Sequence, residues 1–312
     1  MRKILYCIIT LLLISSLFAC NTNKQASTTS NQEDAETFNV DDLTCLIDLH
    51  LHVDGAFSID NVRKLAKLQN IEIPESDEEI LGLLRVSDDC TSLTEFLQKF
   101  SFPATFLNTF DGVKMACSNL AQELKNQGVM YAELRIAPSS CVSNNFDQDA
   151  VVRACIEGID AVDGIKCQII LCCKRESDKQ TNIETIDVAK KYLGKGVCCI
   201  DLAGDEANYP TQNFVDIFEY ANSIDVPFVI HAGEADGPES VRCAVDLGAK
   251  RIGHGIRSVE DPEVVKLLAE KQIALEYCPT SNVKTGIFNS ISEEPYEQLK
   301  NAGVILTVNT DD

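Results

Sequence analysis

The chain has 312 residues and a formal net charge of −21, with 48 acidic side chains against 27 basic ones. Such a charge repels phosphates, so it argues against nucleic-acid binding and, more weakly, against a strongly anionic substrate such as a nucleotide. The length is ample for one large α/β domain, which commonly takes about 250 residues.

The first residues have the pattern of a targeting segment. A basic start, Met1-Arg2-Lys3, precedes an apolar run over residues 4–19, which is too short for a typical membrane span. The run ends Leu17-Phe18-Ala19-Cys20, which resembles a bacterial lipoprotein signal. We therefore expect residues 1–19 to be a signal peptide and Cys20 to anchor the protein to the outside of a bacterial membrane. The alternatives are an ordinary secretory signal, which gives a secreted protein, or an uncleaved anchor.

Residues 20–44 are polar and lack an apolar period, so they predict a flexible, lipid-anchored linker rather than folded structure. The folded domain is expected to span residues 45–312.

The 14 cysteines do not have the spacing of a disulfide framework. Cys172-Cys173 and Cys198-Cys199 lie inside apolar runs, where cysteine packs as a small hydrophobe, and no CxxC pair occurs. We expect most of them to be reduced and buried. This conflicts with export, because exported proteins usually meet an oxidising environment.

From residue 45 onward, short apolar runs alternate with amphipathic segments. Eight such alternations predict a parallel sheet closed into a (β/α)8 TIM barrel. An open doubly wound sheet is the second choice, but no GxGxxG follows the first strand. The predicted strands are Leu46–Leu51, Val129–Arg135, Cys167–Cys173, Val197–Leu202, Val226–Ile230, Arg251–Gly253, Ile273–Tyr277 and Val304–Val308.

The predicted helices lie between these strands, and the first connection, about residues 56–128, is unusually long and largely helical. Insertions of this kind over a barrel mouth often act as lids. The clearest helical patterns are Asp147–Val162, Thr185–Leu193, Thr211–Ser223, Pro262–Lys271 and Glu293–Asn301.

All four histidines of the chain lie at predicted strand ends. His50 and His52 are two residues apart, so in a strand their side chains share one face. An isolated His-x-His is more often ordinary, but His231 and His254 also end apolar runs, and barrel active sites form at the carboxyl ends of strands. Three imidazoles and one carboxylate suit zinc with a position left open for water.

Six short motifs occur in the order found in the adenosine deaminase family of metal-dependent amidohydrolase barrels, which the chain resembles. That resemblance implies zinc-dependent deamination of adenosine and 2′-deoxyadenosine to the inosine nucleosides and ammonia. A further stretch, SLTEFLQKF at 92–100, is similar to the apolar lid over the nucleoside. The motifs are HxHxDG at 50–55, LAGDE at 202–206, HAGE at 231–234, GHG at 253–255, CPTSN at 278–282 and NTDD at 309–312.

The resemblance also implies roles for individual residues. Glu234 protonates ring N1, His254 holds the attacking water, and Asp311 takes its proton. Asp312 bonds N7, the Gly204 amide bonds N3, and Asp54 holds the ribose. The implied zinc ligands are His50, His52, His231 and Asp311, and the implied substrate contacts are His52, Asp54, Gly204, Asp312, Leu93, Phe96 and Phe100.

Without the resemblance, plainer interpretations apply to several of these residues. Gly253-His254-Gly255 is a turn, and Asp205-Glu206 is a pair that caps a helix. Phe96 and Phe100, four residues apart, are one core-facing side of a helix.

The chain stops at Asp312, the last residue of the last motif. We therefore expect a barrel that lacks its eighth helix, with a bare apolar flank beside the first and eighth strands. Two alternatives stay open: an inactive truncated fragment, or a flank covered by another chain. Adenine or another 6-aminopurine is the alternative substrate, and the oligomeric state is undetermined.

Overall fold

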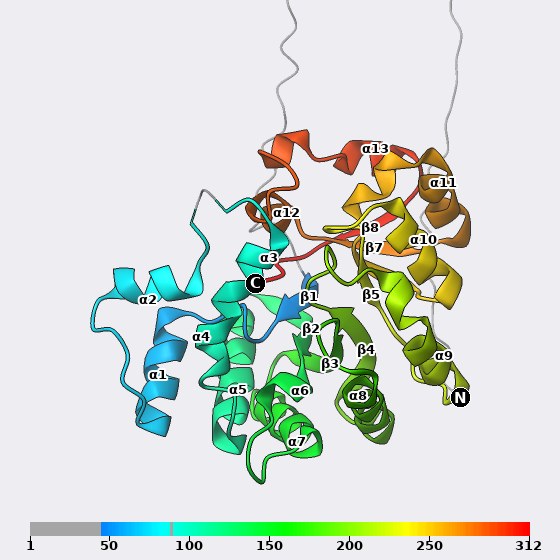
Figure 1. Cartoon of the computed structure of the whole chain (residues 1–312). Coiled ribbons are helices and arrows are strands. Elements are labelled where there is room, and N and C mark those ends of the chain that lie inside the picture. The colour runs from blue at the N-terminus through cyan, green and yellow to red at the C-terminus, as the bar shows by residue number, and fades with distance from the viewer. Residues whose placement is uncertain (1–44, 88–89) are drawn as a thin grey trace, which may run out of the picture. The chain divides into compact units, whose positions relative to one another are not determined.

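The computed structural model describes residues 45–87 and 90–312 (Figure 1). The signal peptide, Cys20 and the linker predicted for residues 1–44 lie outside the described residues. Among the helices that are described, none is both long and apolar enough to cross a membrane.

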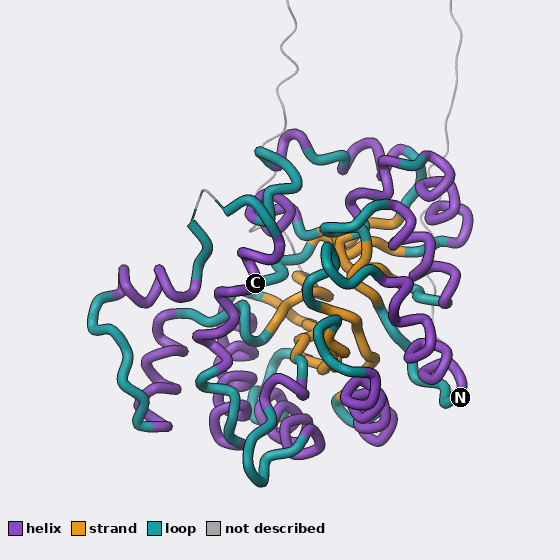
Figure 2. The backbone as a smooth tube through the Cα atoms, viewed as in Figure 1, coloured by secondary structure: helices purple, strands orange, loops and turns teal. Residues whose placement is uncertain are grey.

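Eight parallel strands follow one another in chain order, with helices between them and around them (Figure 2). This confirms the predicted α/β barrel class. The strands are β1 (Leu46–His52), β2 (Val129–Ile136), β3 (Lys166–Lys174), β4 (Val197–Ala203), β5 (Ile230–Ala232), β6 (Arg251–His254), β7 (Ala274–Tyr277) and β8 (Ile305–Val308).

The strands form two four-stranded sheets, β1 to β4 and β5 to β8, which meet at two seams. At one seam a parallel bridge joins Leu51 to Asp311. There the His52 amide donates to the Asp311 carbonyl at 2.7 Å, and the Asp311 amide donates to the His50 carbonyl at 2.8 Å. At the other seam, Ile200 of β4 bridges to Phe228. The first seam therefore places the end of the chain beside the two histidines of β1.

The fifth strand was predicted too early. We expected Val226–Ile230, whereas β5 begins at Ile230. Pro227 lies inside the predicted range and has no backbone N–H, so it cannot donate to a neighbouring strand. Its carbonyl still accepts from the Ile200 amide at 3.0 Å, so this segment closes the seam as an isolated bridge rather than as a regular strand.

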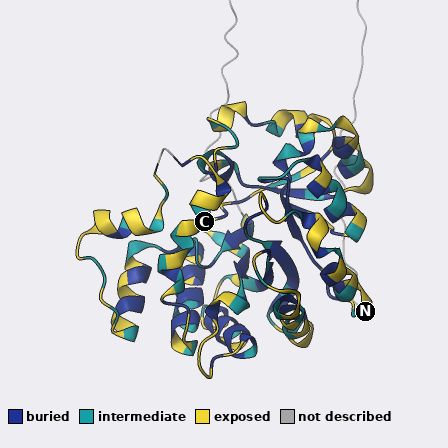
Figure 3. Cartoon of the chain, viewed as in Figure 1, coloured by how far each residue is buried: buried dark blue, intermediate teal, exposed yellow. Residues whose placement is uncertain are grey.

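The helices lie outside the strands, and their buried faces pack on the barrel (Figure 3). Side-chain caps begin several of them: Asp147, for example, accepts from the Ala150 amide at the start of α7. The helices after β2 are α6 (Pro138–Cys141), α7 (Gln148–Ile159), α8 (Lys179–Tyr192), η3 (Thr211–Phe214), α9 (Val215–Ser223), α10 (Pro238–Leu247), η4 (Ile256–Glu260), α11 (Pro262–Lys271), α12 (Pro279–Lys284), η5 (Ile291–Glu293) and α13 (Tyr296–Asn301).

The long connection between β1 and β2 is mainly helical. Its helices are α1 (Ile59–Gln69), α2 (Asp77–Leu84), α3 (Leu93–Phe96), η2 (Leu97–Phe100), α4 (Ser101–Ala104) and α5 (Phe110–Asn126). After β8 the described residues contain no further helix. Ile47 of β1 and Ile305 and Val308 of β8 are exposed by 53%, 41% and 57%, so this flank of the barrel presents apolar side chains to solvent.

All cysteines within residues 45–87 and 90–312 are free, and most are buried. Cys172, Cys173 and Cys199 are buried, whereas Cys198 is partly exposed. Burial raises the pKa of the Cys172 and Cys173 thiols, so these side chains stay neutral as packing groups.

Candidate active site

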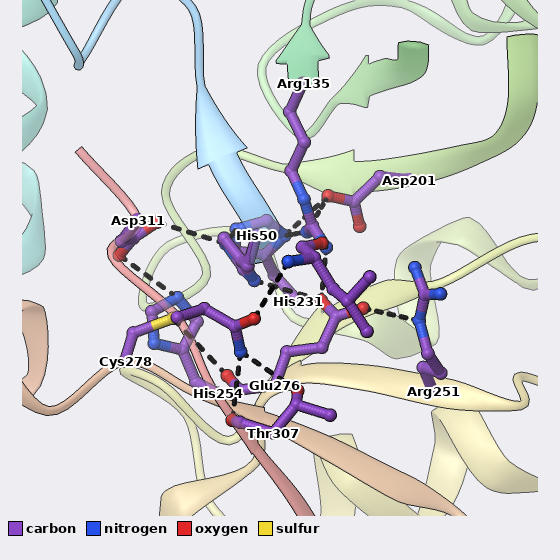
Figure 4. Close-up of polar contacts among 12 residues, drawn as sticks. His50, Arg135, Asp201, His231, Arg251, His254, Glu276, Cys278, Thr307 and Asp311 are labelled. Atoms are coloured by element: carbon purple, nitrogen blue, oxygen red, sulfur yellow. Dashed lines mark hydrogen bonds and ion pairs between the residues drawn. The ribbon is translucent and has the colours of Figure 1, made fainter. Parts of the chain in front are cut away.

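The predicted site residues come together at the carboxyl ends of the strands (Figure 4). His50 and His52 come from β1, His231 from β5 and His254 from β6, while Asp311 directly follows β8. These ends share one edge of the barrel because all the strands are parallel. With the exception of His50, which is fully buried, every predicted catalytic, metal and substrate residue lines one cavity.

Small residues make room for the crowded imidazoles. A Cβ atom at Gly253 would lie 3.0 Å from His50 Cε1 and 3.3 Å from the His231 ring, so a side chain there would crowd both. His254 and Asp311 have φ angles of +58° and +73°, in the left-handed region that residues other than glycine seldom adopt. Backbone strain of this kind is typical of functional sites.

The donor atoms of four predicted ligands converge. His50 Nε2 lies 3.0 Å from His231 Nε2 and 3.0 Å from Asp311 Oδ1. His52 Nε2 lies 3.3 Å from His231 Nε2 and 3.6 Å from the same Asp311 oxygen. His50, His231, His254 and Asp311 each also offer one ligand atom within 4.8 Å of the other three. The site is therefore a buried histidine and aspartate cluster that could bind a metal ion.

Buried carboxylates orient two of these imidazoles. His50 Nδ1 lies 3.0 Å from Glu276 Oε2, and His231 Nδ1 lies 2.8 Å from Asp201 Oδ2. A neutral ring that carries its proton on the Nδ1 facing Glu276 or Asp201 presents the lone pair of its Nε2 atom to the cluster. Arg135 connects the two carboxylates: it donates to Asp201 at 2.7 Å and also to Glu276 (Figure 4).

Both carboxylates are held in the charged form. Burial opposes ionisation of Glu276, but Arg135 and His50 outweigh it and lower the pKa of Glu276 to about 2. Burial likewise opposes ionisation of Asp201, yet His231 and Arg135 hold its pKa well below the usual range. Charged acceptors fix the imidazole tautomers more firmly than neutral ones, because hydrogen bonds to charged groups are stronger.

Asp311 presents its two oxygens to different partners. Oδ1 faces His50 and His52, whereas Oδ2 lies 3.6 Å from His254 Nε2. His254 Nδ1 lies 3.2 Å from the Asn282 side-chain oxygen, whose amide is oriented by donation from Nδ2 to Glu294 at 3.0 Å. The His254 ring lies 5.1 Å from the His50 ring and 5.2 Å from the His231 ring, about as close as the His52 ring does. Its Nε2 also lies 3.7 Å from Glu234 Oε1.

The loop that carries Glu234 is pinned by a second carboxylate, Glu206. Its oxygens accept from the amides of residues 233–236 at 2.8 to 3.0 Å and from the Ser240 hydroxyl. The plain interpretation of Asp205-Glu206 as a helix cap is therefore wrong for Glu206, which supports Glu234 across the barrel edge. Burial raises the pKa of Glu234 well above 4.5, and the negative charges of Asp311 and Glu206 raise it further.

The cavity is closed on one side by the segment from α3 through η2. Leu93, Phe96 and Phe100 all line it, and the Phe100 ring lies 6.3 Å from the His52 ring, edge to face. Phe96 and Phe100 are partly exposed, so they do not belong to the core as their spacing alone suggested. A Cβ at Gly55, in the turn after β1, would lie 1.7 Å from Asp312 Oδ1, so only glycine leaves room for the Asp312 side chain there.

Three residues that hold the site together were not predicted from the sequence: Arg135, Asp201 and Glu276. Each is fully buried in a strand. The signal was present, because a charged residue inside an apolar strand needs a buried partner. Which partners would pair could not be read from the sequence, since they come from β2, β4 and β7.

Comparisons with known proteins agree with this geometry. The family model of adenosine deaminase matches residues 45–312. An adenosine deaminase from Haemophilus ducreyi is 42% identical over 275 residues, which cover 85% of this chain and 80% of that protein. One from Enterococcus faecalis is 35% identical over 268 residues, with 85% and 80% covered.

Solved structures agree on the fold. The crystal structure of an adenine deaminase from Arthrobacter aurescens superposes with a TM-score of 0.77 at 25% identity. The match covers 86% of this chain and 83% of that one.

Proposed function

Because this chain belongs to the adenosine deaminase family, we propose that it hydrolyses adenosine and 2′-deoxyadenosine to the corresponding inosine nucleoside and ammonia, with one zinc ion per chain. The observation that carries the proposal is the convergence of three imidazoles and one carboxylate at a cavity that also holds Glu234, a buried carboxyl whose pKa is raised. A hydrolytic deaminase needs these two features together: activated water and a proton donor.

The residues present fit zinc. His50 Nε2 and His231 Nε2 lie 3.0 Å apart, and a carboxylate faces the Nδ1 atom of each ring. Neutral rings protonated at Nδ1 would direct both Nε2 lone pairs at one cation. We assign His52 Nε2 and Asp311 Oδ1 as the other two ligands. Three imidazoles and one carboxylate match the ligand types that zinc prefers. Zinc, when bound, supplies Lewis-acid activation of a water molecule.

Different side chains around the cavity carry out the proton transfers of the reaction. Glu234 gives its proton to N1 of the purine, which makes C6 electrophilic. His254 Nε2 and Asp311 Oδ2, 3.6 Å apart, hold the attacking water, and Asp311 accepts the proton that it releases. Asp311 passes the proton from water to the amino group, the C6–N bond breaks and ammonia leaves. N1 keeps the proton that Glu234 gave, and the C6 hydroxyl returns its proton to Glu234 as it becomes the 6-oxo group of inosine.

We assign the remaining purine contacts on the same basis. Asp312 faces N7, the Gly204 amide faces N3 and Asp54 holds the ribose. Gly204 has a φ of +112°, and a Cβ there would lie 2.6 Å from the Glu176 carboxylate, so its backbone reaches the cavity only as glycine. Leu93, Phe96 and Phe100 cover the nucleoside with an apolar surface.

For location, we propose that residues 1–19 are removed and that a lipid on Cys20 anchors the domain outside the cytoplasm, with secretion as the alternative. The support is the basic start, the apolar run and the Leu-Phe-Ala-Cys sequence at 17–20.

The test of the catalytic proposal is deamination by the purified protein, loaded with zinc, of adenosine, 2′-deoxyadenosine and adenine. We expect both nucleosides to be turned over with a kcat/KM at least about 100-fold above that of adenine. Preference for the free base would replace the proposed substrate while leaving the reaction type intact. No ammonia from any of the three would refute the activity.

A further inference from the structure

The cavity carries one pair of charged residues to which the proposed mechanism gives no role, Lys174 and Glu176. Lys174 is the last residue of β3, and Glu176 lies two residues beyond. Both line the cavity, and Lys174 is the one lysine or arginine among the described residues that do so. A lone ammonium in an otherwise acidic cavity calls for a ligand group that accepts hydrogen bonds.

The backbone beneath this pair is firmly held. The Lys174 amide donates to Asn182 Oδ1 at 2.9 Å, and Asn182 Nδ2 donates back to the Lys174 carbonyl at 3.0 Å. Glu176 Oε1 accepts from the Asp205 amide at 2.7 Å, beside Gly204. Lys174 Nζ itself is 3.6 Å from Glu176 Oε2, and its side chain is 36% exposed. The ammonium is therefore aimed by Glu176 but keeps hydrogen atoms free for a ligand.

The pair lies at the sugar end of the cavity. Glu176 packs against Gly204, whose amide is assigned to purine N3. N3 lies on the sugar side of the six-membered ring, because it is bonded to C4, which neighbours the glycosidic N9. Lys174 also lines the same cavity as Asp54, the residue assigned to the ribose. The contact of Glu176 with Gly204 and the cavity shared with Asp54 thus place Lys174 where the sugar would lie.

We propose that Lys174 is a specificity-determining residue that donates hydrogen bonds to the ribose hydroxyls, and that Glu176 is a positioning residue that aims it. This inference rests on the proposed function only in taking a purine nucleoside as the ligand. A neutral sugar fits better than a 5′-phosphate, because Asp54, Glu176 and Asp312 line the same cavity and would repel a dianion.

The experiment compares the zinc-loaded protein with Lys174→Met, Lys174→Arg and Glu176→Gln, using adenosine, its 2′-, 3′- and 5′-deoxy analogues, AMP and adenine. Methionine keeps the length of the side chain and removes its charge. Lys166→Met is the matched control, because Lys166 is exposed at the other end of the same strand, β3. Zinc content and melting temperature are measured for every variant, so that a folding defect is recognised.

We expect Lys174→Met to raise the KM for adenosine about 10- to 100-fold, the usual loss for one hydrogen bond to a charged group, while kcat changes less than about threefold. For the wild type, at least one deoxy analogue should have a KM as high as the KM of adenosine for Lys174→Met. The kinetic constants for adenine should be the same in the two proteins. Lys174→Arg should recover part of the loss, and Glu176→Gln should show an intermediate KM.

A second measurement does not depend on turnover. Binding of inosine and of hypoxanthine is measured by calorimetry, and Lys174→Met should weaken only inosine. An unchanged KM profile together with unchanged inosine binding would overturn the inference while leaving deamination intact. A wild type that prefers AMP, with that preference lost in Lys174→Met, would also overturn it in favour of phosphate recognition. A wild type that binds inosine through Lys174 but releases no ammonia would instead refute only the proposed activity.

Discussion

His50 and His231 point their Nε2 atoms at each other across 3.0 Å, while the opposite nitrogen of each ring faces a charged, buried carboxylate. When both rings are neutral and protonated on the Nδ1 atoms that face these carboxylates, their Nε2 lone pairs point at one place, an arrangement that suits a bound cation. Arg135 donates to both carboxylates and so holds them in place. The orientation of the two imidazoles therefore depends on buried residues of several strands, and not on the two histidines alone.

The first prediction separates ligands from neighbours. His52→Ala and His231→Ala should lose zinc, because each removes a donor atom, whereas His254→Ala should retain zinc and lose activity. Metal analysis after dialysis is the measurement. Since His254 also lies within 4.8 Å of three other donors, loss of zinc from His254→Ala with retention in His52→Ala would exchange the roles of the two residues.

Chelation of the wild type extends this test to stability. Removing a tightly bound ion should lower the melting temperature by on the order of 10 °C, because binding at 1,000 times Kd contributes about 4 kcal/mol. Readdition of zinc should restore it. A melting temperature indifferent to chelator would contradict a metal at the centre of the barrel.

The second prediction concerns Glu234→Gln. The amide keeps the shape and the hydrogen bonds of the side chain but has no acidic proton for N1, so kcat should fall about 10²- to 10⁴-fold with zinc content and melting unchanged. Glu239→Gln, exposed in the first turn of α10, is the matched control. Loss of metal from Glu234→Gln would make Glu234 a ligand and remove its assignment as proton donor.

The third prediction uses Glu206. Burial opposes its ionisation, but Arg175, Ser240 and the amides of the 233–236 loop outweigh burial and lower its pKa. A carboxyl with a lowered folded-state pKa stabilises the protein above its unfolded pKa, near 4.5, and loses that contribution as pH falls below it.

Glu206→Gln should therefore lower the free energy of unfolding by about 2–5 kcal/mol at pH 7, because its amide hydrogens face backbone donors. The difference from the wild type should narrow below about pH 4.5. Urea unfolding at pH 7 and pH 4 measures this, with exposed Glu263→Gln as control. A difference that stays constant with pH would show that the charge of Glu206 is not what holds the loop.

The fourth prediction concerns the N-terminus. Cys20→Ala should leave an unprocessed precursor or release the protein to the medium, because no thioether can form at alanine. Metabolic labelling with a fatty acid and cell fractionation are the measurements, with Cys45→Ala as the cysteine control. Unchanged membrane attachment of Cys20→Ala would exclude lipidation at this residue.

The sequence was sufficient for much of the fold, because continuous apolar runs identify buried parallel strands even without alternation. The prediction of the fifth strand was wrong at Pro227, because the apolar run includes this residue although it has no backbone N–H to donate to a neighbouring strand. For the site, the rarity of histidine indicated the metal cluster. The pairing of Arg135 with Asp201 and Glu276, and the hold of Glu206 on the Glu234 loop, depend on the register of distant strands, which residue spacing does not encode.

The proposed metal ligands come from both half-barrels: two histidines from β1, one from β5, and the aspartate that follows β8. No shorter portion of the chain contains the complete set, so a nascent polypeptide has to be synthesised almost to Asp311 before it can hold the ion. Closing a loop of that length is slow and entropically costly. We therefore expect the proposed metal ion to bind late in biogenesis, once the two halves have docked in register.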